Sequence, residues 1–584
     1  MNSLDWIVLI LTLTGIVAYG LYKSRTTHNL EGYFLSNRSM NWGLILLSII
    51  GTQASSITFL SAPGQAYTDG MRFVQYYFGL PIATIVVCIV FVPIFSRLKV
   101  YTAYEYLETR FDVKTRTLTA FLFLLQRGLS TGISVFAPSI ILSSLLGWNI
   151  YWTNLFMGGL LIIYTMSGGA KAVAYTQQLQ LIIIFLGMFL AAYMVVNMLP
   201  KNIGFFDALH VSGKLGKLNV ITTGFKNGKF DWSDQYNLLS GLIGGFFLSL
   251  SYFGADQSQV GRYLTASSLK ESRLGLLMNG LVKIPMQFLI LLVGALVFTF
   301  YQYNKAPIFF NDTQLSKLER SAYKDSFSVA QAQFLVLSKE KREAVARFST
   351  ALNNKDENEI NGKTDELRQL QHSSDSLRGK VKEWVNASGG DGNDTNYIFL
   401  RFVVDFLPKG LVGLLIAIIF LASWGSIAAA LNSLSSCTMI DVHKRFSKRS
   451  MAPEKEYLWS KWYTLGWGIF CIIVAMFTYN IGNSLIEAVN VLGSLFYGVI
   501  LGVFLVAFFL KKIKNGFAVF LGALFAESVV LSVFTFAKLG YFKLGFLWLN
   551  PIGAIGVILF TLLFNVILKQ NGKLHIDKEQ GKSI

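Results

Sequence analysis

The sequence predicts an all-α integral membrane protein with thirteen transmembrane helices. Hydrophobic residues make up 53% of the chain and charged residues 14%, a balance typical of a polytopic membrane protein. Apolar runs also recur from one end of the chain to the other, and most approach or exceed the roughly 20 residues that a spanning helix needs. The thirteen runs are Trp6–Leu21, Trp42–Ala66, Val74–Leu98, Leu118–Leu146, Tyr151–Met166, Leu179–Leu199, Leu238–Leu250 with an irregular extension to about Val260, Leu274–Tyr301, Leu411–Met439, Trp462–Tyr479, Leu485–Leu510, Phe517–Phe536 and Leu547–Leu568.

The distribution of basic residues predicts the orientation. Asp5 precedes the first run, whereas Lys23 and Arg25 follow it, so the basic region of a cleaved signal peptide is missing. By the positive-inside rule the N-terminus is outside and the C-terminus is cytoplasmic. We expect a multi-pass protein of the cell membrane, a bacterial inner membrane, whose net charge of +18 meets anionic inner-leaflet lipid and not nucleic acid. The inner loops then carry Arg97, Lys99, Arg110, Lys114 and Arg116; Arg262, Lys270 and Arg273; Lys444, Arg445, Lys448 and Arg449; and Lys511, Lys512 and Lys514.

The runs divide the chain into five segments. These are residues 1–22, a leading helix; 41–303, the first repeat and the start of the second; 304–396, a polar insert; 397–511, the remainder of the core; and 515–584, two further helix segments and a cytoplasmic tail. The insert is highly charged, and its leucine spacing, as in Leu367–Leu370–Leu377, is typical of amphipathic helices. Helix parity places it outside, and we interpret it as a solvated helical cap without chemistry of its own.

Several classes of function find no support in the chain. Cys88, Cys437 and Cys471 all fall within predicted helices, and no Cys/His spacing indicates a metal site. A phosphate-cradling lysine loop is missing, and so is a set of nucleophile, base and acid. We therefore expect neither an enzyme nor an ATP-driven pump, and any uphill work must draw on an ion gradient or a partner.

Two of the predicted spans are interrupted. The second contains Gly51–Thr58 and the seventh contains Tyr252–Ser258, both rich in small and polar residues at membrane depth. Unwound backbone is tolerated in lipid only where it lines a cavity, and its freed carbonyls suit a small hard cation. Helix packing through glycine and serine is the alternative for either span alone. Once the leading helix is set aside, the interruptions fall in helices one and six of a ten-helix core, as two inverted five-helix repeats require.

A charged residue also lies at membrane depth. Arg127 falls inside the run Leu118–Leu146, roughly 15 Å along a helix that starts near Thr117 at about 1.5 Å per residue. A charge near the bilayer midplane is costly and usually marks a pathway or binding site. The alternatives are a buried structural ion pair or a different helix start.

Short motifs across the core resemble the sodium/solute symporter family, which includes sodium–glucose, proline, iodide, monocarboxylate, multivitamin and sialic acid carriers. The resemblance covers nearly the whole chain except the insert, and the motifs fall in order on the expected helices. It implies a LeuT-like fold and sodium-coupled symport by alternating access. The motifs are Ser55–Leu60 before Ala62-Pro63-Gly64 and Tyr67, Tyr104–Glu108 before Arg110-Phe111, Tyr164 with Ser167-Gly168-Gly169, Asp256-Gln257 before Arg262-Tyr263-Leu264, and Leu431-Asn432-Ser433.

The resemblance implies a site for the coupling sodium ion. Such a site uses carbonyl and hydroxyl oxygens of partly unwound helices. Gly425 stands where relatives often have a second serine, and Gln177 stands where many have an acid that supports the sodium site. With that charge removed, we expect one sodium ion per cycle. The matching positions are Gly51, Ala54, Ala422, Gly425 and Ser426.

The resemblance also implies a substrate cavity. Ile57 occupies a position that is acidic in a sugar carrier, and Ser249 offers a short hydroxyl where that carrier has an amide. Arginine's planar fork suits a carboxylate, and some sialic acid carriers use an arginine on the corresponding helix. The candidate substrate contacts are Gln53, Thr58, Gln75, Tyr77, Arg127, Tyr252, Lys283 and Asn490.

We therefore expect a sodium-coupled symporter that imports a small organic solute, with a slight preference for one that bears a carboxylate. A sodium-coupled carrier of neutral sugars or polyols is the main alternative, and a transporter-like sensor is a minor one.

Overall fold

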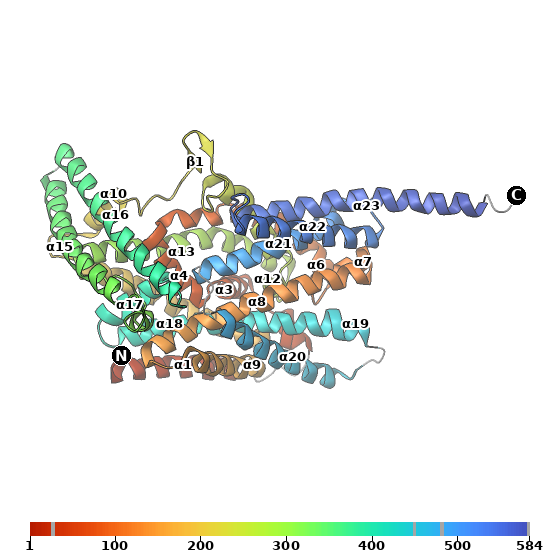
Figure 1. The fold of residues 1–584 in the computed structure, drawn as a ribbon. Coiled ribbons are helices and arrows are strands. Elements are labelled where there is room, and N and C mark those ends of the chain that lie inside the picture. The colour runs from red at the N-terminus through yellow and green to blue at the C-terminus, as the bar shows by residue number, and fades with distance from the viewer. Residues whose placement is uncertain (25–29, 355, 448–450, 479–483, 581–584) are drawn as a thin grey trace.

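The structure is a computed structural model of all 584 residues, and it describes the chain except residues 25–29, 355, 448–450, 479–483 and 581–584. Long helices lie side by side along one axis (Figure 1). The N-terminus and the helices α15 (Lys324–Asn354) and α16 (Glu357–Ala387) lie at one end of the bundle, and α23 (Leu549–Gln580) projects beyond the other. Arg25, Lys448 and Arg449, which belong to the predicted inner basic flanks, lie outside the described residues.

The remaining elements are nearly all helical. A short antiparallel hairpin, β1 (Phe225–Lys226) with β2 (Lys229–Phe230), lies in the loop between α10 and η4. The other elements are α1 (Ser3–Ser24), α2 (Leu30–Leu35), η1 (Ser36–Arg38), α3 (Trp42–Gln53), α4 (Ser56–Asp69), η2 (Met71–Tyr77), α5 (Leu80–Val86), η3 (Val87–Phe91), α6 (Val92–Leu98), α7 (Glu105–Arg110), α8 (Val113–Leu146), α9 (Ile150–Asn197), α10 (Phe205–Lys214), η4 (Ser240–Gly244), α11 (Gly245–Gly254), α12 (Gln257–Tyr263), α13 (Leu269–Tyr303), α14 (Asp312–Leu318), α17 (Thr395–Phe406), α18 (Leu411–Cys437), η5 (Thr438–His443), α19 (Lys444–Phe446), α20 (Pro453–Phe477), α21 (Leu485–Phe509), α22 (Gly516–Lys538) and η7 (Phe546–Trp548).

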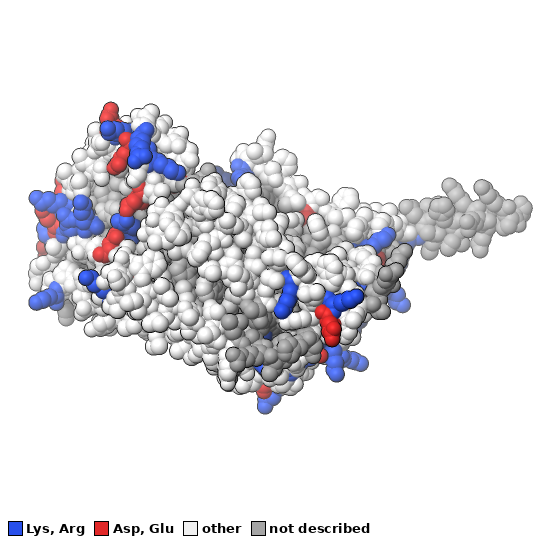
Figure 2. All heavy atoms as spheres, turned by 90° about the horizontal axis from the view of Figure 1, so that it is seen from below, with Lys and Arg blue, Asp and Glu red and all other residues white. Residues whose placement is uncertain are grey.

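The helices have the length and composition of membrane spans. Within the described residues, 10 helices are long and apolar enough to cross a membrane, or 11 when the bent pair α3 and α4 counts as one span. Two shorter apolar helices, Ile150–Met166 and Ser240–Gly254, fall where the fifth and seventh spans are predicted. The count of thirteen therefore stays a prediction. Figure 2 shows a central band of the surface almost free of charged side chains, with Lys, Arg, Asp and Glu gathered toward the two ends, as a protein surrounded by lipid requires.

Both predicted interruptions are present. The chain bends by 61° between α3 and α4, where Ala54 and Ser55 leave the helical conformation. The break thus comes three residues after Gly51. The second break lies between α11 and α12, where Ala255 and Asp256 are non-helical. At each break the last carbonyls of the outgoing helix and the first amides of the next one lack their usual helical partners.

The insert folds as a helical hairpin that packs on the helical bundle through apolar side chains. Val345, Phe348 and Leu367 of α15 and α16 form a cluster with Val211 of α10, and Tyr303 at the end of α13 packs against it. A second cluster joins Phe327, Phe334, Val381 and Val385 to Ile308 and Phe309, which follow α13. The hairpin is thereby fixed to the end of the bundle that carries the N-terminus (Figure 1).

Candidate functional site

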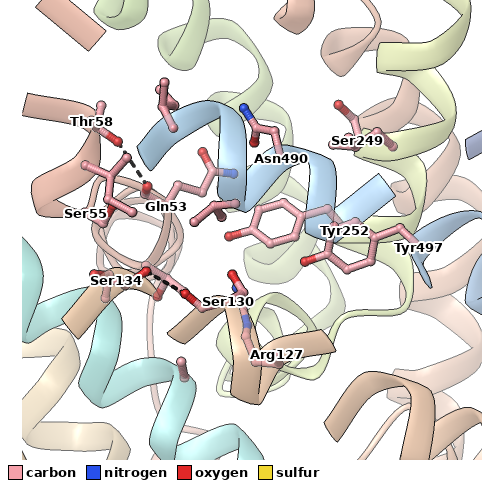
Figure 3. A pocket seen from close by; sticks show the side chains of 18 of the residues that line it. Gln53, Ser55, Thr58, Arg127, Ser130, Ser134, Ser249, Tyr252, Asn490 and Tyr497 are labelled. Atoms are coloured by element: carbon pink, nitrogen blue, oxygen red, sulfur yellow. Dashed lines mark hydrogen bonds between the residues drawn. The ribbon is translucent and has the colours of Figure 1, made fainter. Parts of the chain in front are cut away.

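A cavity of about 140 Å³ lies at the level of both helix breaks. A single water needs only roughly 10–15 Å³ on this measure, so the cavity has room for a solute of several heavy atoms. Its walls come from the break between α3 and α4, from α8, α11, α13, α18 and α21, and from the tyrosines of η2. In Figure 3 the labelled side chains of these elements converge on one space, with Arg127 extending toward Tyr252 and Tyr497 and with Gln53 and Thr58 on another side.

Seven of the eight predicted substrate contacts line this cavity: Gln53, Thr58, Tyr77, Arg127, Tyr252, Lys283 and Asn490. The exception is Gln75, which is fully buried outside it. The Gln75 amide nitrogen donates to the hydroxyl of Thr222 at 2.9 Å and to the carbonyl of Tyr236 at 3.0 Å. Residues two apart on a helix do not face the same side, so Tyr77 and Gln75 cannot both reach the cavity. Gln75 instead holds the loop between α10 and η4 in place.

The polar wall of the cavity is partly pre-organised. The Tyr76 hydroxyl donates to the side-chain oxygen of Asn490 at 3.1 Å, and the amide nitrogen of Gln259 donates to the Tyr252 hydroxyl at 2.7 Å. The amide nitrogen of Asn490 and the amide oxygen of Gln53 are buried and have no hydrogen-bond partner among the described residues. An unpaired buried polar group costs roughly 1–3 kcal/mol, so these two atoms are available to a solute's hydroxyl or carbonyl groups.

Among the residues that the structure describes, two cationic side chains and no carboxylate line the cavity. The ammonium of Lys283 lies 5.3 Å from the centre of the Tyr77 ring. Among the described residues, no carboxylate lies within 4.0 Å of this ammonium. The guanidinium of Arg127 lies 5.5 Å from the centre of the Tyr252 ring and is 3.4 Å from the carboxylate of Asp256, just behind the wall.

Two of the predicted sodium ligands, Gly51 and Gly425, lie beside Gln177 of α9. Its amide nitrogen donates to the carbonyl of Gly425 on α18 at 3.0 Å, and its amide oxygen accepts from the Ser48 hydroxyl of α3 at 2.9 Å. A Cβ placed on Gly51 would come within 2.9 Å of the Gln177 side chain, so α3 and α9 pack closely there. This neutral amide therefore joins the two helices that carry the candidate ligands. The carbonyls of Gly51 and Ala54 belong to α3 and its end, and Ala422, Gly425 and Ser426 belong to α18.

Ser426 lines the cavity itself. Its hydroxyl donates within α18 to the carbonyls of Ala422 at 3.0 Å and Ser423 at 3.1 Å. A hydroxyl that donates to a carbonyl keeps its lone pairs for another partner. One candidate ion ligand, Ser426, thus borders the candidate solute cavity.

Sequence reasoning missed part of the wall. Ser130 and Ser134 of α8 line the cavity together with Arg127. Their spacing of three and seven residues from Arg127 is the pattern of one helix face, and this signal was present in the sequence. Tyr497 also lines the cavity, two turns after Asn490 on α21. Asp256 was noticed in a motif, but its ion pair with Arg127 was not foreseen.

Comparison with known proteins agrees with this arrangement. The model of the sodium:solute symporter family matches residues 33–314 and 380–526, well over half of the chain. The chain belongs to the sodium:solute symporter family. The unmatched gap between these two ranges falls within the insert.

Two sialic acid symporters match this chain over nearly their full length. The chain is 25% identical to the sodium/sialic acid symporter SiaT of Proteus mirabilis (strain HI4320), over 99% of this chain and 98% of that protein. It is 25% identical to the sodium/sialic acid symporter NanT of Aliivibrio fischeri (strain ATCC 700601 / ES114), over 98% and 94%. A solved structure of a Na⁺-coupled sialic acid symporter superimposes with a TM-score of 0.72 at 23% identity, covering 97% of this chain and 98% of that one.

The family and the shared fold confirm three predictions. The chain is a helical membrane transporter with a LeuT-like fold, it acts by sodium-coupled symport of a small organic solute, and sodium is the coupling ion.

Proposed function

We propose that this symporter imports an acidic organic solute, such as a sugar acid or another small carboxylate, together with sodium. The observation that carries the proposal is the charge of the cavity lining, which has two cations, Arg127 and Lys283, and no carboxylate. Two cations in a low-dielectric cavity favour an anionic occupant, because a neutral solute brings no counter-charge for Lys283 and none beyond that of Asp256 for Arg127. The names of two relatives, both sialic acid symporters at 25% identity, support the same class of solute.

Each cation has a separate role in this proposal. The guanidinium of Arg127 offers parallel donors that match a carboxylate, whereas the ammonium of Lys283 is a point charge that serves a carboxylate or a hydroxyl. Gln53, Thr58 and Asn490 supply hydrogen bonds to the remaining polar groups of the solute. Tyr252 lies beside Arg127 and covers the solute from the side of α11.

We infer that one sodium ion accompanies each solute. It binds between the end of α3 and α18, to the carbonyls of Gly51, Ala54 and Ala422, the backbone of Gly425 and the hydroxyl of Ser426. The neutral amide of Gln177, bonded to both helices, supplies no charge for a second ion. Uptake of a monoanion with one sodium is then electroneutral, whereas a neutral solute would carry one positive charge inward.

The proposed orientation places the N-terminus and the insert outside and the C-terminus in the cytoplasm of a bacterial cell, with the protein in the inner membrane. The basic inner-loop residues and the positive-inside rule support it. Anionic lipid of the inner leaflet is the partner of that basic end.

Uptake into proteoliposomes tests the proposal. Radiolabelled N-acetylneuraminate, pyruvate and galactose are offered with an inward sodium gradient, and with choline in place of sodium. Sodium-dependent uptake of an acid, without an inward current, is the expected result. Arg127→Lys keeps the charge but loses the fork, so it should weaken affinity for the acid more than affinity for sodium.

A neutral sugar or polyol is the second candidate solute. It is favoured by the ion pair between Arg127 and Asp256, which already neutralises one of the two cations. Saturable, sodium-dependent and electrogenic uptake of galactose, with no uptake of either acid, would establish this alternative.

A further inference from the structure

Asp256 is a buried carboxylate that holds the inner half of the broken seventh span to α8. It is 1% exposed and caps the N-terminus of α12. Its side chain is 3.4 Å from the guanidinium of Arg127 on α8, and it accepts a hydrogen bond from the Tyr497 hydroxyl of α21 at 2.7 Å. Arg127 also donates to the hydroxyl of Ser258 in the first turn of α12. Three separate elements therefore meet at one carboxylate.

The contact between Arg127 and Asp256 is weaker than an arginine–carboxylate pair can be. It uses one terminal nitrogen of the guanidinium at 3.4 Å, whereas well-formed pairs are bidentate at about 2.7–2.9 Å. The Nε of Arg127 is buried and has no hydrogen-bond partner within the described part of the chain. The cavity-lining guanidinium thus keeps unused donor capacity, and a second carboxylate arriving in the cavity can use it.

Asp256 does not depend on Arg127 alone. Its oxygens accept from the Ser258 amide at 2.7 Å, from the Ser258 hydroxyl at 2.6 Å and from the Tyr497 hydroxyl at 2.7 Å. These three bonds remain when Arg127 turns away. Arg127, in contrast, would be left as an unpaired buried cation unless another anion replaced Asp256. The exchange of partners is therefore favourable only when the incoming solute is itself an anion.

We propose that Asp256 is a specificity-determining residue, an internal carboxylate that competes with the solute's carboxylate for Arg127. An acidic solute that captures Arg127 releases α12 from α8, and this separation is the first step in opening the inner half of the pathway. A neutral solute binds without releasing α12. Anion selectivity is thus exerted on the conformational change as well as on binding, and the inference rests on the proposed acidic solute.

Two further contacts hold α12 in the same place, and they provide a reporter. The Tyr104 hydroxyl donates to the carbonyl of Ala255 at 2.8 Å, and the Ser433 hydroxyl of α18 donates to the carbonyl of Gln257 at 3.5 Å. Ser433 is 3% exposed and faces α12. A cysteine placed there gains access to an alkylating reagent only when α12 moves away.

The experiment uses the full chain, reconstituted, with Cys88, Cys437 and Cys471 replaced by alanine and with Ser433→Cys added. Alkylation by N-ethylmaleimide is followed without solute, with N-acetylneuraminate or pyruvate, and with galactose. The acid that binds should raise the alkylation rate several-fold in the parent, and galactose should not. Asp256→Asn should raise it without any solute, because the competing charge that holds α12 is gone.

Binding of the same probes gives the second measurement. Asp256→Asn should tighten binding of the acid by about tenfold, because the acid no longer has to replace the charge-assisted hydrogen bond between Arg127 and Asp256. Binding of galactose should not change. In the double variant Arg127→Gln with Asp256→Asn, which leaves no unpaired charge behind, the acid should lose this gain.

A matched control separates release of α12 from general loosening. Asp441 is also a fully buried, arginine-paired carboxylate, at 2.7 Å from Arg116, but it lies on η5 and not on α12. Asp441→Asn should leave alkylation of the Ser433→Cys reporter unchanged. Equal increases in the two variants, or weaker acid binding in Asp256→Asn, would overturn the competition while leaving the acidic solute in place. If the parent binds galactose and neither acid, the proposed solute class is wrong and the competition falls with it.

Discussion

Substituting Lys341 by methionine should stabilise the insert at neutral pH. Lys341 lies on α15, is 7% exposed, and donates a hydrogen bond to the side-chain oxygen of Gln371 at 2.9 Å. The pKa of Lys341 is lowered from 10.5 to about 8, chiefly by burial; Asp375 opposes this shift, and Arg378 and Lys217 contribute to it. The protonated Lys341 therefore lowers the free energy of unfolding of the insert.

The sign and size of the effect follow from this shift. Between pH 8 and 10.5 the unfolded chain holds a proton at Lys341 that the folded insert does not, so stability rises with pH across this window. Below pH 8 both states are protonated and the cost is complete. A pKa difference of about 2.5 corresponds to roughly 3 kcal/mol at 1.36 kcal/mol per unit, and the lost bond to Gln371 offsets about 1 kcal/mol. Lys341→Met should therefore stabilise the insert by about 2 kcal/mol at pH 7.

Hydrogen exchange of α15 and α16 peptides in the full-length protein measures this change. At pH 7 the variant should open roughly 30-fold less often than the parent, the factor that corresponds to about 2 kcal/mol. Near pH 10 the ammonium cost has fallen to about the size of the lost hydrogen bond, so the two proteins should exchange alike. Lys339→Met, two residues away at an exposed position of the same helix, is the control and should have no effect at either pH. A variant that is less protected at pH 7, or equally stabilised at both pH values, refutes the reasoning.

Three further predictions concern ion binding, helix packing and the insert. Ser426→Ala removes one candidate ligand and should raise the sodium concentration for half-maximal uptake several-fold. Ser436→Ala, further along the same helix, is the control and should not raise it. If both variants show the same sodium dependence of uptake, Ser426 is not a sodium ligand. Gly294→Ala places a Cβ 2.1 Å from a backbone carbonyl of α4, so the amount of folded protein in detergent should fall sharply. Gly466→Ala, whose Cβ would meet nothing within 4 Å, is the control. Equal yields of the two variants would contradict the close packing of α13 on α4. Deletion of 313–389 with a flexible linker should preserve most sodium-dependent uptake, because no cavity residue lies inside it; loss of uptake in a folded, inserted protein would give the insert a role in capture or gating.

The features predicted well are those encoded in local stretches of sequence. Apolar runs identify spans because each helix must satisfy its own backbone in lipid, whatever its neighbours are. The two breaks were predictable on the same physical ground, since small and polar residues gather at membrane depth mainly where a span is interrupted beside a cavity. The first break, at Ala54 and Ser55, lies within the predicted interruption Gly51–Thr58, although Gly51 itself remains helical.

Side-chain direction within a helix was also partly predictable. Gln75 and Tyr77 were both proposed as solute contacts, although residues two apart point away from each other on any helix. Ser130 and Ser134, in contrast, lie three and seven residues after Arg127, a spacing that places all three side chains on one face of α8. Applying helix phase would have added Ser130 and Ser134 on α8 and excluded one of Gln75 and Tyr77 on η2; the structure shows that Gln75 is the one outside the cavity.

The partner of Arg127 could not be predicted in this way. Asp256 is 129 residues away in sequence, and only the packing of α8 against the seventh span brings the two together. From sequence, an arginine at membrane depth indicates either a structural ion pair or an anion site, and these were treated as alternatives. The structure shows the ion pair on a guanidinium that also lines the cavity and keeps an unpaired Nε. The same arginine can therefore serve both purposes in turn, because a transporter that alternates between states needs contacts which are satisfied in one state and exchanged in the next.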